Sequence, residues 1–278
     1  HMIAGRLDGG IEIGALQAGF FFREFLRNTL GSAGFGTDRP DVAMQTIREY
    51  YERGAADWNV RDHIPLGKVV VQAHRGAGDL APEGSLEAFE LGWRLGCIPE
   101  ADLRQTRDGV IVSFHDANFA RILPDAPEEL KRKGVEDLTF EEARQLDVGG
   151  FRDSQFKGQR MISLAEMVQR LEAQPDRALY IDIKKVDFRR LAAETVGVHP
   201  QLILASTKYD ELKLWRQLAP RSRTLHWMGG PRNWTSPSTD PTTDPQARLA
   251  QRLEALRAVR FAGIDQLQIG RASCRERV

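Results

Sequence analysis

Short apolar runs alternate along this chain with stretches in which apolar residues recur at helical spacing. The runs predict buried strands at residues 69–71, 110–112, 178–184, 202–205, 223–227 and 263–268. Helices are predicted at residues 42–52, 139–143, 163–167 and 247–259, and residues 128–133 are a charged helical piece expected to face solvent. Strands that alternate with helices are typical of a parallel α/β fold. The periodicity alone leaves open whether the parallel sheet is open or closed into a barrel.

Residues 1–67 precede the first of these apolar runs, and their pattern predicts helices. The amphipathic stretch at 11–30 carries a cluster of phenylalanines at 20–25. Such an aromatic face is usually core packing, and a membrane-surface or partner helix is the alternative. The glycines of 30–39 predict a loop, and 42–52 predicts a second helix. The segment is therefore expected to be an N-terminal helical extension.

The composition excludes several classes of protein. The 278 residues include 41% hydrophobic and 28% charged residues, which is an ordinary globular balance. The charges of the 39 acidic and 39 basic residues cancel, so the sequence has no excess of positive charge that would favour binding to nucleic acid or an anionic membrane. The two cysteines are too few for a disulfide framework or a cysteine-based zinc site, and Cys97 is expected to be a small buried hydrophobe. No apolar stretch reaches the ~20 residues of a membrane helix.

Candidate chemistry is concentrated at the ends of the predicted strands. His74 and Arg75 follow the first apolar run, and His115 follows the second. Glu100 and Asp102 lie two residues apart, so in a strand their carboxylates point to one face and repel each other. A hard divalent cation between them would relieve that repulsion. The alternative is that the two acids lie at a strand edge, exposed to solvent, without a functional role.

Two further features support a site in this region. Asp108-Gly109 is a hairpin signal that returns the chain to His115, near the carboxylates. Asp182 and Lys184 share a face of a later predicted strand, which a simple salt bridge at a strand end would also explain.

The order and spacing of these residues resemble the glycerophosphodiester phosphodiesterase family, of the phospholipase-C-like barrel type, over residues 68–230. The matching sequences are HRG at 74–76, PEGSLEAF at 82–89, EAD at 100–102, TRDG at 106–109, HD at 115–116 and DIK at 182–184. The chain departs from the family pattern in two places. Gly84 stands where asparagine is usual, and Asp182 stands where glutamate is usual.

The resemblance implies a TIM-type (β/α)8 barrel with its site at the carboxyl ends of the strands. By the same resemblance, Glu100, Asp102 and Asp182 hold one Mg²⁺ or Ca²⁺, and His74 and His115 are the acid–base pair. Arg75 and Lys184 bind the phosphate, and Glu83 orients Arg75 or the substrate. The implied reaction is metal-dependent hydrolysis of a glycerophosphodiester to glycerol 3-phosphate and an alcohol, with no nucleic-acid partner.

Two alternatives remain open at this stage. The same barrel type supports lipid-directed, phospholipase-like phosphodiesterases, and the aromatic stretch at 11–30 and the loop-like residues 229–245 could serve a lipid head group. The chain could also be an inactive, truncated phosphodiester-binding fragment. Membrane association stays open but is not indicated, and the sequence does not determine the compartment or the oligomeric state.

The expected organisation is an N-terminal helical extension at 1–67, a barrel at 68–268 and a non-native tail at 269–278, which looks like a translated sequencing adapter. The residues at the start, His1-Met2, resemble a cloning scar or the edge of a partial reading frame. Counting strands from residue 68 gives a barrel truncated to about six of the eight strands of this fold.

Overall fold

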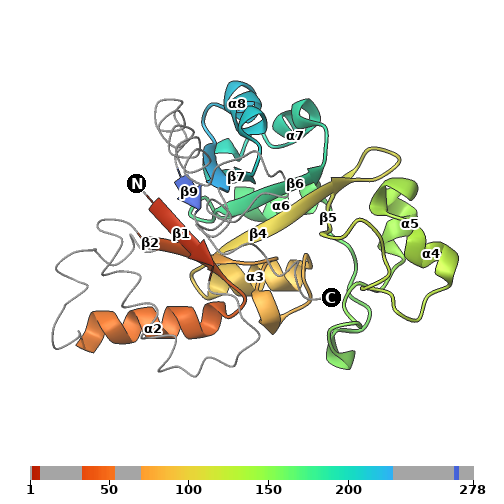
Figure 1. Cartoon of the computed structure of the whole chain (residues 1–278), viewed down its shortest axis with the longest axis horizontal. Helices are drawn as coiled ribbons and strands as arrows, with labels where there is room; N and C mark the ends of the chain where they lie inside the picture. Colours follow the sequence, from red (N-terminus) through yellow and green to blue (C-terminus); the bar gives the residue numbers. More distant parts are fainter. Residues whose placement is uncertain (1, 7–32, 54–69, 228–265, 269–278) are drawn as a thin grey trace, which may run out of the picture.

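The computed structural model describes residues 2–6, 33–53, 70–227 and 266–268, which are coloured in Figure 1. Within these residues nine strands form one sheet. Eight of them run parallel, and β5 (Ile111–Ser113) runs antiparallel to β4. The parallel strands are β1 (Met2–Arg6), β2 (Ala33–Thr37), β3 (Val70–Ala73), β4 (Ile98–Gln105), β6 (Leu179–Lys185), β7 (Leu202–Ser206), β8 (Arg223–Trp227) and β9 (Gln266–Gln268).

The parallel strands close into a ring that follows the order of the sequence. Each strand pairs with the next, β1 also pairs with β9, and the pairing of β3 with β4 completes the circle. A closed ring of eight parallel strands is the TIM-type barrel that the sequence predicted. Closure satisfies the backbone hydrogen bonds that an open sheet leaves at its edges.

The six barrel strands expected from residue 68 onward are all present, and the segment before residue 68, expected to be helical, supplies two more. Strand β2 occupies Ala33–Thr37, where glycines predicted a loop, and β1 occupies Met2–Arg6. Their sequences, MIAGR and AGFGT, are short and rich in small residues, so they lack the branched apolar run that indicates a buried strand. Their place in the barrel is evident from pairing with distant strands.

Helices connect the strands and cover the outside of the barrel (Figure 1). The predicted helix at 42–52 is α2 (Pro40–Arg53). The others are α3 (Leu86–Arg94), α4 (Glu128–Arg132), α5 (Phe140–Arg144), α6 (Leu164–Glu172), α7 (Phe188–Glu194) and α8 (Tyr209–Leu218), with 3₁₀ turns η2 (Gly78–Leu80), η3 (Val135–Asp137), η4 (Ser154–Phe156) and η5 (His199–Gln201). As expected from sequence, Thr139 and Ser163 are N-caps, and each forms a capping box with a glutamate three residues later.

Four expectations lie outside the described residues. They are the amphipathic stretch at 11–30, the loop at 229–245, the helix at 247–259 and the tail at 269–278.

The alternation of side chains along the strands divides the core into two layers. On β6, Leu179 and Ile181 join a cluster that includes helix residues such as Trp215, whereas Tyr180 lies with residues of β7 and β8. The first layer lies between sheet and helices, and the second lies inside the barrel. Position 182 shares the inner face with Tyr180, so the same alternation that builds the core points a carboxylate into the barrel.

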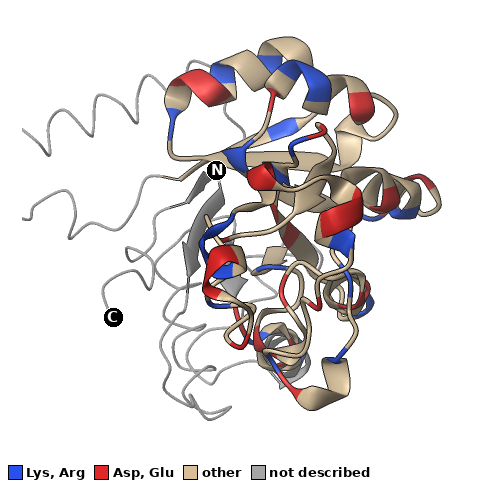
Figure 2. Ribbon diagram, turned by 90° about the vertical axis from the view of Figure 1, so that its right-hand side faces the viewer, with Lys and Arg blue, Asp and Glu red and all other residues tan. Residues whose placement is uncertain are grey.

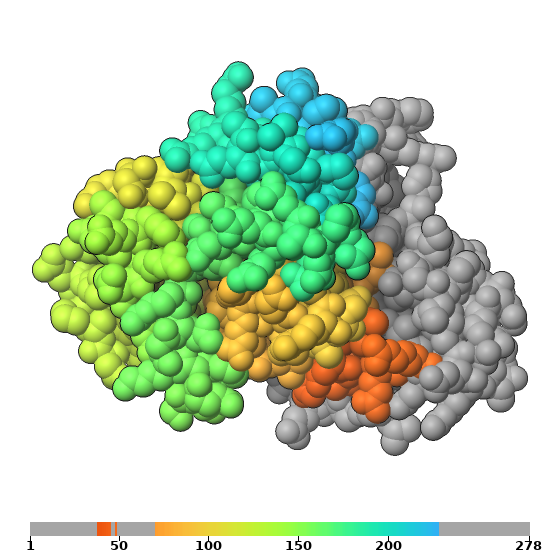
Figure 3. All heavy atoms as spheres, turned by 180° about the vertical axis from the view of Figure 1, so that it is seen from behind, coloured from red at the N-terminus to blue at the C-terminus, as the bar shows by residue number. Residues whose placement is uncertain are grey.

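The segment that follows β4 packs its own hydrophobic cluster beside the barrel. Its buried side chains include Phe114, Phe119, Ile122 and Val148. In Figure 3 this segment, yellow to light green, forms a lobe next to the barrel's helices, and the described part of α2, in orange-red, lies beside α3. The lobe carries the residues that follow His115, so it forms one wall of the site described below.

Acidic and basic residues are interspersed over the described helices, as Figure 2 shows. Among the described residues, no helix combines the length and the apolar character that crossing a bilayer requires. Cys97 is 5% exposed, as expected for a small hydrophobe, and burial raises the pKa of its thiol to about 12.

Candidate active site

Three carboxylates from adjacent strands converge inside the barrel. Glu100 and Asp102 lie on β4, Asp182 lies on β6, and the parallel register sets Asp102 directly opposite Asp182. Each contributes an oxygen that lies within 4.8 Å of the other two, and the residues are 1%, 3% and 8% exposed. Buried carboxylates so close together are stable only when protons or cations neutralise them.

Lys184 supplies part of this neutralisation. Its Nζ lies 2.7 Å from Asp182 Oδ2 and 3.0 Å from Asp102 Oδ1. Burial alone would lower the pKa of Lys184, but the two aspartates outweigh burial and raise it, so the side chain is an ammonium. Burial likewise favours the neutral form of Asp102, yet Lys184 and the surrounding cations hold its pKa below the usual value.

The lysine does not neutralise the whole cluster. Burial, followed by the charge of Asp102, raises the pKa of Asp182 to about 7. Asp102 Oδ1 is within ion-pair distance of Lys184 but has no hydrogen bond of good geometry among the described residues. An excess of negative charge and an unsatisfied buried oxygen fit a divalent cation with oxygen ligands. The residues present are therefore suited to the metal that the sequence predicted.

Arg75 joins the carboxylate cluster to the loop that follows β3. Its backbone N–H donates to Glu100 Oε2 at 3.0 Å, and its Nη1 donates to Glu83 Oε2 at 2.9 Å. Its φ of +52° is in the left-handed region, which costs a non-glycine residue ~1–2 kcal/mol. Backbone strain of this kind is concentrated at functional sites, where surrounding contacts hold it in place. Here the contacts to Glu100 and Glu83 hold the guanidinium next to the cluster.

Each of the two predicted histidines is paired with an aspartate through Nδ1. His74 Nδ1 lies 2.6 Å from Asp38 Oδ1 and His115 Nδ1 lies 2.7 Å from Asp116 Oδ1, so each ring nitrogen is placed to donate a proton to a carboxylate. His74 Nε2 lies 3.9 Å from Glu100 Oε2, which directs that nitrogen toward the carboxylate cluster. A carboxylate on one ring nitrogen fixes the tautomer and leaves the other nitrogen available to a substrate.

Arg121 is a member of the site that the sequence analysis missed. It donates to Asp116 at 2.7 Å and to both oxygens of Glu83. Burial alone would raise the pKa of Asp116, but the hydrogen bonds from His115 and Arg121 hold it well below its usual range. Arg121 thus links the carboxylate that holds His115 to the one that holds Arg75. No motif marked it, because a lone arginine in a loop has no local signal.

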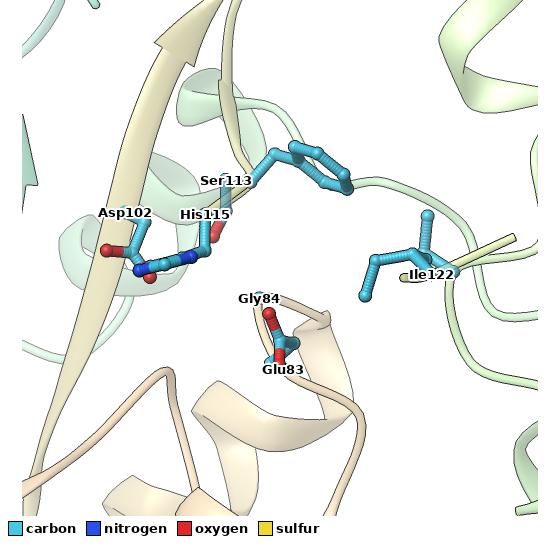
Figure 4. Close-up of a pocket in the computed structure, with 8 residues that line it drawn as sticks. Glu83, Gly84, Asp102, Ser113, His115 and Ile122 are labelled. Carbon is cyan, nitrogen blue, oxygen red and sulfur yellow. The ribbon is translucent and has the colours of Figure 1, made fainter. Parts of the chain in front are cut away.

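The close-up in Figure 4 shows Asp102, Ser113 and His115 on one side of a small pocket, with Glu83 and Gly84 below and Ile122 opposite. The complete lining is Glu83, Gly84, Asp102, Ser113, Phe114, His115, Ile122 and Val148. The pocket is polar toward the carboxylates and apolar toward the lobe. Ser113 Oγ is buried and has no hydrogen-bond partner among the described residues.

Gly84→Asn is expected to lower the free energy of unfolding by less than about 1 kcal/mol, whereas Gly84→Val should lower it by more than about 2 kcal/mol. Gly84 has a φ of +65°, which asparagine tolerates far better than a β-branched residue does. A Cβ at this position would lie 2.9 Å from Ser113 Oγ, which can rotate away and then accept a hydrogen bond from the amide. Urea unfolding of both variants tests this, and equal losses would show that the backbone conformation is not the determinant.

The structure brings all the predicted site residues into one connected set. Asp102 contacts Lys184 and approaches Arg75, Glu100 binds the Arg75 backbone, and Glu83 binds the Arg75 guanidinium. His115 lines the same pocket as Asp102 and Glu83. Asp38 was missed because it follows β2, which the sequence did not predict as a strand. Arrangements of this kind, with acids, bases and cations around a buried cluster, are suited to phosphoryl chemistry.

Comparison with known proteins agrees with this geometry. The family model described as "Glycerophosphoryl diester phosphodiesterase family" matches residues 74–271. A curated glycerophosphodiester phosphodiesterase of Caldanaerobacter subterraneus subsp. tengcongensis is 34% identical over 163 residues, which cover 55% of this chain and 64% of the relative. The chain thus spans less than two thirds of the curated relatives that it matches first.

Solved structures share the fold. The crystal structure of a glycerophosphodiester phosphodiesterase from Agrobacterium tumefaciens superposes with a TM-score of 0.51 at 24% identity, over 72% of this chain and 85% of that one. An Oleispira antarctica phosphodiesterase, solved in complex with its product sn-glycerol 3-phosphate, gives a TM-score of 0.51 at 22% identity, over 72% of this chain and 83% of that one.

Proposed function

The chain belongs to the glycerophosphoryl diester phosphodiesterase family, and we propose that it hydrolyses glycerophosphodiesters to glycerol 3-phosphate and an alcohol. The observation that carries the proposal is the convergence of three buried carboxylates, two cationic side chains and two aspartate-paired histidines at one end of the barrel. Acids, bases and a cation site together are what cleavage of a phosphodiester requires.

The carboxylates of Glu100, Asp102 and Asp182 would hold one Mg²⁺ or Ca²⁺. When bound, a divalent cation neutralises charge on the phosphoryl oxygens and lowers the pKa of a hydroxyl close to it. Lys184 and Arg75 border the same cluster and complement the phosphate charge, Lys184 as a point charge and Arg75 as a planar donor. Glu83 keeps Arg75 in place.

His74 and His115 divide the proton transfers between them. One takes the proton from the substrate's neighbouring hydroxyl as that oxygen attacks phosphorus, and the other gives a proton to the departing alcohol oxygen. The new P–O bond replaces the bond to the alcohol, which gives a cyclic phosphodiester. Water then opens the ring with the two histidines in exchanged roles, and the product is glycerol 3-phosphate. Asp116, on Nδ1 of His115, stabilises the imidazolium that forms in these steps.

Release of glycerol 3-phosphate from glycerophosphocholine tests the proposal directly. We expect release with Mg²⁺ or Ca²⁺ and none with EDTA, measured on a sample whose circular dichroism shows the mixed helix and strand content of the barrel. A panel with lysophosphatidylcholine separates a soluble diester from a lipid substrate, because a lipid-directed enzyme would prefer the latter. A folded sample that cleaves neither compound under any metal condition would refute the proposed activity.

A further inference from the structure

One of the two histidines is within hydrogen-bond distance of a carboxylate that lies outside the residues matched by the family model. Asp38 follows directly after β2, and the family match begins at His74. The Oδ1 atom of Asp38 lies 2.6 Å from His74 Nδ1, and the two side chains are 28% and 12% exposed. A distance this short between a ring N–H and a carboxylate is typical of a charge-assisted hydrogen bond. The contact joins a segment near the start of the chain to the loop that carries the acid–base residue.

Asp38 is held by its backbone as well as by its side chain. Its carbonyl oxygen accepts the backbone N–H of Asp79 at 2.7 Å. A Cβ on Gly78 would lie only 2.0 Å from that same carbonyl oxygen, so the close approach of the two loops depends on glycine there. Helix α2 begins at Pro40, two residues after Asp38. The carboxylate therefore lies between a barrel strand and a helix, on a rigid support.

The arrangement repeats the one at the second histidine. His115 has Asp116 on Nδ1, and His74 has Asp38 on Nδ1. The His115 partner comes from the next residue of the motif, whereas the His74 partner is 36 positions away in sequence. Each of the two proposed acid–base histidines thus has an aspartate on Nδ1. One aspartate comes from the adjacent residue, and the other comes from a distant segment of the chain.

We propose that Asp38 is a positioning residue for His74, which fixes the Nδ1–H tautomer and directs Nε2 toward the phosphodiester. The inference rests on the proposed function for its catalytic consequence. The ring of His74 is oriented so that its Nε2 lies 3.9 Å from Glu100 Oε2, on the side of the carboxylate cluster. A carboxylate in this position keeps the ring oriented and stabilises the imidazolium when His74 takes a proton. The segment ahead of the family match therefore supplies part of the site, as well as two strands of the barrel.

Asp38→Asn tests the proposal, because an amide of the same shape can donate to Nδ1 and so favour the opposite tautomer. We expect kcat to fall by at least about 100-fold with KM within about threefold of the parent, as for a group that acts through an acid–base histidine. Nitrogen-15 spectra of the full chain, with His74 assigned through His74→Gln, should show Nδ1–H in the parent and Nε2–H in the variant.

Asp41→Asn is the matched control, since it makes the same change three positions along the segment. Asp41 pairs with Arg39 on the surface, so the variant should keep the parent's kcat and His74 spectrum. The proposal is overturned if Asp38→Asn keeps the Nδ1–H signal and kcat within about threefold. An Nε2–H signal in the parent also overturns it, and that measurement stands even if the variant does not fold. If the parent cleaves no substrate, the proposed function fails while the spectrum still decides the role of Asp38.

Discussion

Replacing His115 with alanine is expected to lower kcat for glycerophosphocholine by about 10²–10⁴-fold, the range of a single acid–base group. His115 lines the pocket with Asp102, and Asp116 fixes its Nδ1, so its Nε2 is the free nitrogen for proton transfer. The ring follows β5 and is partly exposed, so its removal deprives the barrel of little packing. The far-ultraviolet spectrum and the melting temperature should stay close to those of the parent. His74→Ala should behave in the same way.

A third histidine provides a matched control. His199 lies in η5 and is 4% exposed; its Nε2 is 3.0 Å from the carbonyl oxygen of Ala192 in α7, and its ring packs edge-on against Trp215. His199→Gln should lower the free energy of unfolding and leave kcat close to that of the parent. A His115→Ala or His74→Ala enzyme with a near-normal kcat would eliminate the two-histidine mechanism.

Short-range patterns in the sequence were sufficient to place some of the candidate site residues. Glu100 and Asp102 could be placed on one face because a strand alternates every two residues, and that face is the interior of the barrel. The carboxylate cluster needed Asp182 as well, and only the resemblance linked it to the other two acids. An aspartate is one methylene shorter than the usual glutamate. The register nevertheless sets it opposite Asp102, and its oxygen reaches within 4.8 Å of both partners.

The parts that the sequence did not predict depend on long-range pairing. Strands β1 and β2 contain small residues and glycines, so no local preference marks them, and their hydrogen bonds go to strands far along the chain. Asp38 could have been found by the rule that barrel sites lie at the carboxyl ends of strands, but only if β2 had been recognised first. Arg121 owes its position to the lobe, where it contacts the Phe151 ring and two carboxylates that come from separate loops.

Removing the divalent cation is expected to abolish release of glycerol 3-phosphate, and adding it back should stabilise the fold. A ligand that binds only the folded protein stabilises it by about 2.7 kcal/mol at a concentration 100 times its Kd. Asp102→Asn should lose both the activity and the thermal shift, because Asp102 lies opposite Asp182 in the centre of the cluster. Asp210→Asn, which alters an exposed pair with Lys213 on α8, is the control and should keep both.

The cation's effect should also depend on pH in a defined direction. Burial and the charge of Asp102 raise the pKa of Asp182 to about 7 in the metal-free protein, so below that pH the carboxyl holds a proton that a metal must displace. The apparent metal affinity should therefore fall by about tenfold per pH unit below 7 and level off above it. Thermal shifts with Ca²⁺ or Mg²⁺ at pH 6 and pH 8 measure this, and the larger shift is expected at pH 8. Asp182→Asn carries no titrating group at this position, so its weaker metal binding should no longer change across pH 7. A shift that is equal at both pH values in the parent would show that Asp182 does not titrate between them. Cleavage that persists in EDTA would show that the cluster acts without a metal.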